Sequence, residues 1–294
     1  NKNIIIPITE LITIRESFSL GFFSLIVISS VIGIIIFLFR YRVATALGAT
    51  PSLMKGVIEY LVILCLCVPF FTGGSYLAAG IRTMGMPTFS MFCTVLGSVL
   101  NIILDYVFVV LWGWGVAGAA LASGIAFFIS FLLAFIKIQS KDSILKLKKC
   151  KINLRKIGRF FYNGSSEALT EVAVAFTTFI FNIVLMRKIG EMGVSAFSII
   201  QYIASLVVAV YLGIANGITP IISYNYGAKK GERINELIKY ASKVMVILGI
   251  ICTGFLFFGG ETLISFFVSN DKILLETTSL ACKIYSLAFL DRKS

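Results

Sequence analysis

Long runs without a charged residue recur along this chain, and they constrain its fold more than any other feature. Three of them, 17–39, 60–81 and 192–228, are long enough to cross a lipid bilayer, since a helix needs about 20 residues to span the hydrocarbon core. The runs lack the alternation of apolar and polar residues that a transmembrane β-barrel requires. With 58% hydrophobic and only 14% charged residues, the sequence predicts an all-α, polytopic membrane protein.

Proline, glycine and charge clusters divide the chain into seven expected spanning helices, and an eighth is expected to begin near residue 272. The predicted ranges are 17–39, 56–81, 87–110, 115–137, 163–187, 193–222 and 242–268. Pro51 and Pro87 mark the approach to the second helix and the start of the third. Gly113 and Gly115 separate the third helix from the fourth.

The Lys and Arg residues lie between the predicted helices and are unequally divided between the two sides of the membrane. Nine of the 26 fall within 137–159. Up to residue 243, seventeen fall on one side and five on the other, so the positive-inside rule places the N-terminus and the segments 138–160 and 223–241 in the cytoplasm. The net charge of +12 therefore indicates loops that face anionic lipid at the cell membrane, and not a nucleic-acid partner.

The residue types that carry most metal and nucleophilic chemistry are absent or scattered. The chain has no histidine, so any proton relay must use carboxylates. The spacing of the six cysteines indicates neither a metal site nor a disulfide framework, and Cys65 and Cys67 are expected to be packing residues. An intramembrane enzyme is therefore disfavoured, and no cofactor is expected.

Asp105 is the single charged residue in the range 83–136. A carboxylate in the middle of an apolar helix costs about 2.5–3.5 kcal/mol and is usually kept only where it faces a bundle interior or a wet cavity. Asn101 lies four residues earlier, so its amide and the carboxylate share one helix face. The pair is predicted to take up and release protons. The alternative is a carboxylate that snorkels to the outer interface near Trp112 and Trp114.

Two acids spaced by four residues, Glu167 and Glu171, lie in the predicted helix 163–187, and Asn182 follows about three turns later. The helix dipole favours an acid at the position of Glu167, which is an alternative explanation for that residue. Glu171 lies deeper, where this explanation is weaker. Pro220 lies inside a long apolar run and is predicted to bend its helix, with a simple helix end as the alternative.

A succession of motifs carries a resemblance to a known family. The first half contains SYLAAGIRTMGMP, LGSVLNIILDYVFV and GWGVAGAALASGIA, and the second half contains NGSSEALTEVAVAFTTFIFN, GVSAFSII and GIANGITPIISYNYGAKKGER. Their order resembles the multidrug and toxic compound extrusion (MATE) transporters, and is most similar to the bacterial branch with DinF-like and MepA-like members. Family members have about twelve helices in two lobes of six. The resemblance implies that this chain spans the third helix to the start of the tenth, as a fragment without the first two and the last helices.

The resemblance also implies roles for single positions. Asn101 and Asp105 match the Asn and Asp of the family's fifth helix, and Ser123 falls where a small hydroxyl lies on the next helix. These three residues are therefore expected to bind a proton or cation, with Na⁺ as an alternative occupant at Asp105. Glu171 resembles the acid of the seventh helix that faces the central cavity. Together with Glu167 and Asn182 on the same helix, Glu171 is expected to serve coupling or substrate binding.

The expected architecture is a MATE-like two-lobe helix bundle with seven to eight of about twelve helices present. It divides into a partial N-terminal lobe (1–138), a basic cytoplasmic loop (139–160) and a partial C-terminal lobe (161–294). The expected function is proton- or sodium-coupled antiport by a monomer that exports small cationic or amphiphilic compounds, such as drugs, across the cytoplasmic membrane.

Two other functions stay open. A lipid-linked oligosaccharide flippase of the same superfamily would need a large cationic cavity, whereas the predicted membrane segments contain acids and almost no Lys or Arg. A truncated membrane fragment without transport activity is the second alternative.

Overall fold

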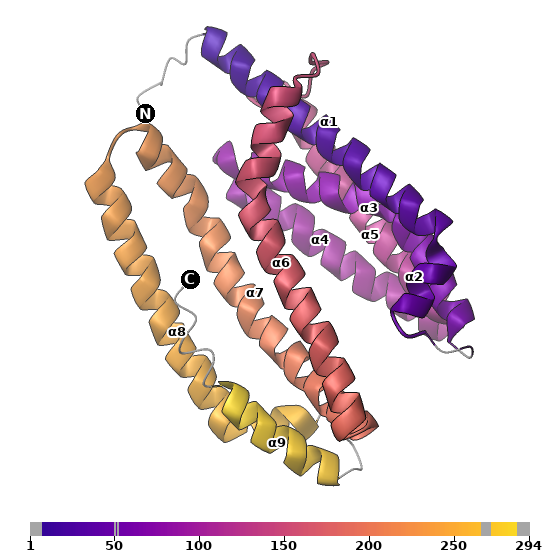
Figure 1. Cartoon of the computed structure of the whole chain (residues 1–294). Coiled ribbons are helices and arrows are strands. Elements are labelled where there is room, and N and C mark those ends of the chain that lie inside the picture. The colour runs from indigo at the N-terminus through magenta and orange to yellow at the C-terminus, as the bar shows by residue number, and fades with distance from the viewer. Residues whose placement is uncertain (1–7, 50, 52, 266–271, 287–294) are drawn as a thin grey trace. The chain divides into compact units, whose positions relative to one another are not determined.

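The computed structural model describes residues 8–49, 51, 53–265 and 272–286, and over these residues the chain forms helices and no strand (Figure 1). In order, the elements are α1 (Ile8–Leu38), α2 (Arg40–Ala46), α3 (Met54–Thr83), α4 (Pro87–Asp105), the π-helix η1 (Tyr106–Leu111), α5 (Gly115–Gln139), α6 (Leu154–Lys188), α7 (Glu191–Gly227), α8 (Gly231–Ser265) and α9 (Lys272–Ser286). Within the described part, seven helices are long and apolar enough to cross a membrane: α1, α3, α4 continued by η1, α5, α6, α7 and α8. The predicted all-α, polytopic membrane fold is confirmed.

The predicted spanning helices coincide with these seven, and α9 begins at Lys272, where the sequence predicts the eighth. Three predicted starts are wrong. α1 begins at Ile8 and not at 17, α6 begins at Leu154 and not at 163, and α8 begins at Gly231 and not at 242. The apolar run marks only the part of a helix that lies in hydrocarbon, because helical turns beyond the membrane contain polar residues and give no hydropathy signal.

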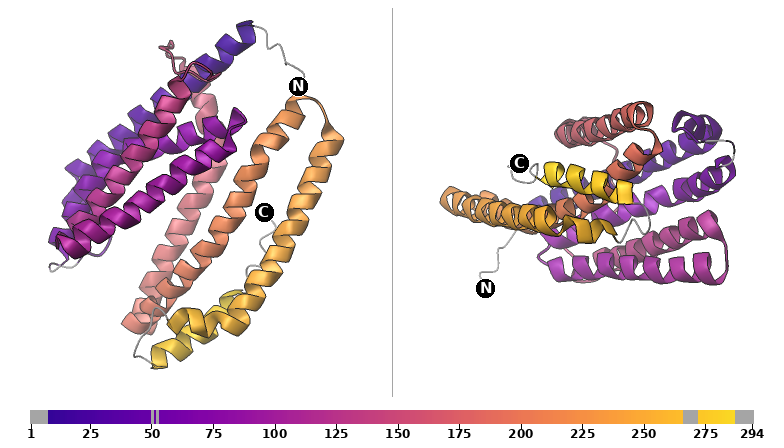
Figure 2. Two further views of the ribbon diagram at one scale, coloured as in Figure 1. Left: turned by 180° about the vertical axis from the view of Figure 1, so that it is seen from behind. Right: turned by 90° about the horizontal axis from the view of Figure 1, so that it is seen from below.

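Two compact units divide the chain, Asn1–Gly164 and Ser165–Ser294. In unit 1, α3 packs against α1, α4 and α5, and α5 also packs against α4 and η1 (Figure 2). Buried apolar side chains from α1, α3, α5 and the segment after α5 form one core: Phe22, Leu77, Ile81, Ala134, Ile138, Leu145 and Leu147. This core holds the scaffold on which α4 and η1 are placed.

Small residues let the helices of unit 1 approach closely. Gly33 of α1 faces the α3 backbone, where an alanine Cβ would lie 2.8 Å from the carbonyl oxygen of Cys65. Gly97 of α4 faces Ser130 of α5, whose hydroxyl would overlap an added Cβ and donates to the carbonyl of Cys93 at 3.1 Å. Small side chains and interhelical hydrogen bonds hold helices together in lipid, where the hydrophobic effect does not drive their association.

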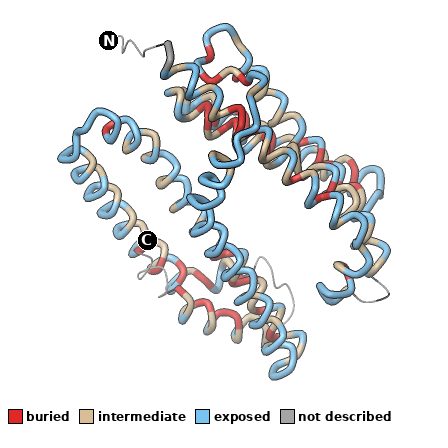
Figure 3. Tube along the Cα trace, turned by 45° about the horizontal axis from the view of Figure 1, so that its top comes forward, coloured by how far each residue is buried: buried red, intermediate tan, exposed pale blue. Residues whose placement is uncertain are grey.

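In unit 2, α7, α8 and α9 pack against one another. Their buried side chains form a second core: Ile199, Ile200, Ile203, Ala204, Val207, Leu256, Ile264 and Cys282. The hydroxyl of Thr253 in α8 donates to the carbonyl of Ser286 in α9 at 3.1 Å. In contrast, α6 has no buried residue and is exposed along nearly all of its length (Figure 3).

Candidate functional site

Asp105 is the last residue of α4 and lies at its junction with η1. After it the helix widens, and the amide of Trp112 donates at 2.9 Å to the carbonyl of Val107, five residues earlier. Such π-turns are rare and often occur at functional sites. The predicted carboxylate therefore lies at an irregular point of its helix.

Asn101 and Ser123 lie together between α4 and α5. Nδ2 of Asn101 donates to Oγ of Ser123 at 3.2 Å, and both residues are half-buried. Asp105 follows Asn101 by one helical turn, and its Oδ1 is buried and has no hydrogen-bond partner among the described residues. A buried polar atom without a partner costs about 1–3 kcal/mol. A proton or a cation bound to this oxygen would remove that cost.

The donor set fits a hard cation as well as a proton. Because Asn101 uses its NH₂ group in the bond to Ser123, its carbonyl oxygen is left as an acceptor one helical turn before Asp105. Carboxylate, carbonyl and hydroxyl oxygens are the ligands that hard cations prefer. Oδ1 of Asp105 is buried while the residue as a whole is half-buried, and the alternative in which Asp105 snorkels to the outer interface stays open.

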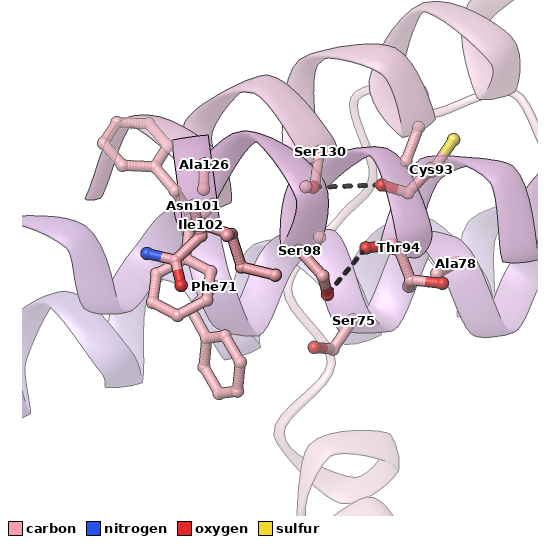
Figure 4. A pocket seen from close by; sticks show the side chains of 15 residues that line it. Phe71, Ser75, Ala78, Cys93, Thr94, Ser98, Asn101, Ile102, Ala126 and Ser130 are labelled. Carbon is pink, nitrogen blue, oxygen red and sulfur yellow. Dashed lines mark hydrogen bonds between the residues drawn. The ribbon is translucent and has the colours of Figure 1, made fainter. Parts of the chain in front are cut away.

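A pocket of about 420 Å³ lies between α3, α4 and α5 (Figure 4). Its lining combines aromatic rings with hydroxyl groups, and in the part of the chain that the structure describes it contains no charged side chain: the rings are Phe70, Phe71 and Phe127, and the hydroxyls are Ser75, Thr94, Ser98 and Ser130. Asn101 also lines the pocket, whereas Asp105 and Ser123 do not. Asn101 therefore connects the pocket to the candidate ion site, and the lining suits a flat amphiphilic molecule.

A cluster of three aromatic rings follows the carboxylate in the chain. Phe108 stacks on Trp112 and Trp114 with centroid distances of 5.1 and 5.2 Å, and the two tryptophan rings are 4.8 Å apart. Phe108 is buried and both tryptophans are about half exposed. Gly113 and Gly115, both with positive φ, form the turn between η1 and α5 that lets Trp114 reach Phe108. Sequence reasoning missed this cluster, because it depends on the π-turn.

The predicted site residues of α6 differ in how far their side chains are buried. Glu167 and Glu171 have exposed side chains, and their roles stay predictions. Asn182 has a buried Oδ1 without a hydrogen-bond partner in the described part of the chain.

Pro220 lies within the next helix, because α7 continues through it to Gly227. The interpretation of Pro220 as a helix end is therefore wrong, and the bend stays a prediction.

A second pocket, of about 570 Å³, lies in unit 2 between α6, α7 and α9. Phe181 of α6 stacks on Phe197 of α7 at a centroid distance of 5.5 Å and an interplanar angle of 17°. Thr170, Thr177 and Thr178 also line the pocket, and none of the lining residues is charged. Sequence reasoning missed this pocket, although threonines seven and eight residues apart share a helix face and indicate a polar stripe.

Proteins of known family match this chain in sequence. A family profile described as MatE matches residues 12–107 and 168–290. The multidrug export protein MepA of Staphylococcus aureus (strain NCTC 8325 / PS 47) is 26% identical over 255 residues, which cover 86% of this chain and 56% of the relative. MepA of Staphylococcus saprophyticus is 25% identical over 266 residues, covering 88% and 58%. The chain thus spans less than two thirds of the length of these curated relatives.

Solved structures share the fold at lower identity. An outward-facing conformation of a multidrug resistance MATE family transporter of the MOP superfamily superposes with a TM-score of 0.81 at 20% identity, covering 96% of this chain and 69% of that one. A MOP superfamily transporter from Pyrococcus furiosus gives a TM-score of 0.80 at 20% identity, with the same coverage. The predicted two-lobe helix bundle is confirmed.

Proposed function

The chain belongs to the MatE family of membrane transporters, as its motifs predict, and we propose that it exports organic cations and other amphiphiles across the cytoplasmic membrane by cation-coupled antiport. Seven candidate spans within the described residues and the shared fold support a transporter. The relatives are named multidrug export proteins. Because the chain spans 56% of their length, their activity enters here as part of the proposal.

The proposed coupling rests on one observation: Oδ1 of Asp105 is buried and has no hydrogen-bond partner within the described ranges. A carboxylate in an apolar segment is costly and is kept mainly on ion pathways. Its cost falls when a proton or Na⁺ binds and returns when the ion leaves. Asp105 can therefore alternate between two states of different free energy, which a coupling site requires.

In the proposed cycle, the ion and the substrate compete through Asn101. While Asp105 has no bound ion, the Asn101 amide donates to Ser123 and contributes to the pocket. When a proton or Na⁺ binds Asp105, the carbonyl oxygen of Asn101 turns toward it and the pocket loses a polar contact. The ion-loaded state then binds substrate less tightly, and an ion shifts a conformational equilibrium only through such a difference in affinity.

The charge distribution supports a proposed orientation of the chain in the membrane. With seventeen Lys and Arg on one side and five on the other, the N-terminus and the segment 139–160 are cytoplasmic in the proposed orientation. Substrate then enters from the cytoplasm, and the coupling ion enters from outside. We keep the monomer as the transporting form in this proposal.

A lipid-linked oligosaccharide flippase of the same superfamily is supported less well. Such a protein needs cationic groups to hold phosphates, and among the described residues no Lys or Arg lines either of the two pockets. Aromatic rings and hydroxyl groups suit flat compounds whose positive charge interacts with a ring face.

The test is efflux of a fluorescent cationic dye by membrane vesicles that carry the gene product, driven separately by a pH gradient and by a sodium gradient. Asp105→Asn is expected to reduce efflux to the level of vesicles without the protein. Asp142→Asn, a matched change at an exposed carboxylate, is expected to keep full efflux at equal membrane levels. Normal efflux by Asp105→Asn removes this residue from the mechanism, and efflux that responds to neither gradient refutes antiport.

A further inference from the structure

The segment that connects α5 to α6, residues 140–153, is non-helical but is packed onto unit 1, and we call it the basic linker. Its side chains at Ser143, Leu145 and Leu147 are buried. The two leucines belong to the core of unit 1, and the Ser143 hydroxyl donates to the sulfur of Met84 at 3.4 Å. The backbone N–H of Leu147 donates to Oε1 of Gln139 at 3.1 Å. Alternate residues of the linker thus point inward.

Two more hydrogen bonds fix the basic linker to α1. Nε of Arg15 donates to the carbonyl of Ile144 at 2.7 Å. The backbone N–H of Lys148 donates to the hydroxyl of Ser19 at 3.0 Å, and Ser19 is completely buried. A free loop would lose conformational entropy on making these contacts. The linker is therefore a fixed surface of unit 1.

Half of the exposed side chains of this surface are lysines. Lys148, Lys149 and Lys151 are exposed, and five lysines but only one acid, Asp142, lie within 140–153. Because the backbone is fixed at Ile144 and at Lys148, the lysines next to these points start from a fixed place on unit 1. Such a cluster attracts polyanionic surfaces.

Exposed apolar side chains lie among the lysines. Ile144 is 44%, Ile152 is 80% and Leu154 is 78% exposed. A water-facing loop gains nothing from exposing three large aliphatic residues, whereas an element at the membrane interface inserts such residues between lipid head groups and leaves its basic residues at the phosphates. The long stems of the lysines can also lie along the acyl boundary.

We infer that the basic linker is a binding surface for anionic phospholipid head groups at the cytoplasmic leaflet, with Ile152 and Leu154 inserted at the acyl boundary. The inference goes beyond transport and relies only on the proposed orientation of the chain. A basic residue near an anionic membrane strengthens binding about fivefold. Loss of three exposed lysines should therefore weaken the binding of anionic lipid by about a hundredfold.

The experiment titrates the protein, purified in a neutral detergent, with phosphatidylglycerol, phosphatidylcholine or inorganic phosphate, and follows its melting temperature. Phosphatidylglycerol is expected to raise the melting temperature of the wild type, and the other two are expected to leave it unchanged. In Lys148→Gln/Lys149→Gln/Lys151→Gln the half-saturating concentration of phosphatidylglycerol should rise about a hundredfold.

Two further variants keep the inference falsifiable. Arg187→Gln/Lys188→Gln removes two exposed charges on α6 and should keep the wild-type response, whereas Ile152→Ser/Leu154→Ser should weaken binding without abolishing the preference for anionic lipid. An equal response to inorganic phosphate, or an unchanged response in the triple lysine variant, overturns the inference. Asp105→Asn should bind lipid as the wild type does, so loss of transport and loss of lipid binding are distinguishable.

Discussion

The contact between Gly33 and α3 gives a quantitative test of how closely the helices of unit 1 pack. In Gly33→Ala the new Cβ would lie 2.8 Å from the carbonyl oxygen of Cys65, where ordinary contacts begin at 3.4 Å. The oxygen belongs to the backbone and cannot rotate away as a side chain would. Helices α1 and α3 must therefore move apart along this contact.

The magnitude follows from two opposing effects. Overpacking of a well-packed interior costs about 1–3 kcal/mol, and alanine offsets this by about 1 kcal/mol through its higher helix propensity. The net loss in the free energy of unfolding should be about 1 kcal/mol. Gly158→Ala is the matched control, because an added Cβ meets no atom within 4 Å there and only the favourable propensity remains.

The assay is unfolding in mixed micelles with increasing SDS, followed by circular dichroism. Gly33→Ala should unfold at a lower SDS fraction than the wild type, and Gly158→Ala at the same or a higher one. The free energies of unfolding of the two variants should differ by about 2 kcal/mol, because Gly33→Ala loses about 1 kcal/mol and Gly158→Ala gains about 1 kcal/mol. Equal unfolding curves for the two variants would show that α1 and α3 are not in close contact at Gly33.

Two further predictions concern the candidate site and its pocket. Asn101→Ala and Ser123→Ala should each raise the ion concentration for half-maximal dye efflux. The double variant should match the larger single effect, because both changes remove the same interhelical hydrogen bond, which contributes about 0.6 kcal/mol, or about threefold; strictly additive effects would contradict their contact. Gly97→Ala should displace the Ser130 hydroxyl and weaken dye binding measured by fluorescence polarisation. Adding Ser130→Ala should restore binding, since the Cβ atoms would then be 3.3 Å apart, and failure of this rescue would refute the steric explanation.

Hydropathy predicted most of the fold because few backbone structures are stable in lipid. A segment inside the bilayer must satisfy its backbone hydrogen bonds internally, so each apolar run of sufficient length forms a helix. The early starts of α6 at Leu154 and of α8 at Gly231 were beyond this signal, because those turns contain charged residues and lie outside the apolar runs. The positions of helix ends depend on local backbone contacts, which the hydropathy pattern does not encode.

The sequence predicted the part of the candidate site that depends on spacing along one helix. It missed the parts that depend on how the helices pack. Asn101 and Asp105 share a face by helical spacing alone, and the match to a family position led to Ser123, which the structure brings to Asn101. The π-turn after Asp105 has no residue signature, so the stacking of Phe108 was missed. The pocket of unit 2 was missed because it depends on how three helices pack, one of which, α9, follows the other two only after α8.

The aromatic cluster after Asp105 gives the protein an optical probe of its own. The chain has two tryptophans in total, and both belong to this cluster. Membrane proteins usually distribute tryptophans over both interfaces, so that their emission averages many environments. Here the indole emission comes from one place, just after the carboxylate that is proposed to bind the ion. The spectrum of the unlabelled protein therefore reports on the end of η1 and on the turn that follows it.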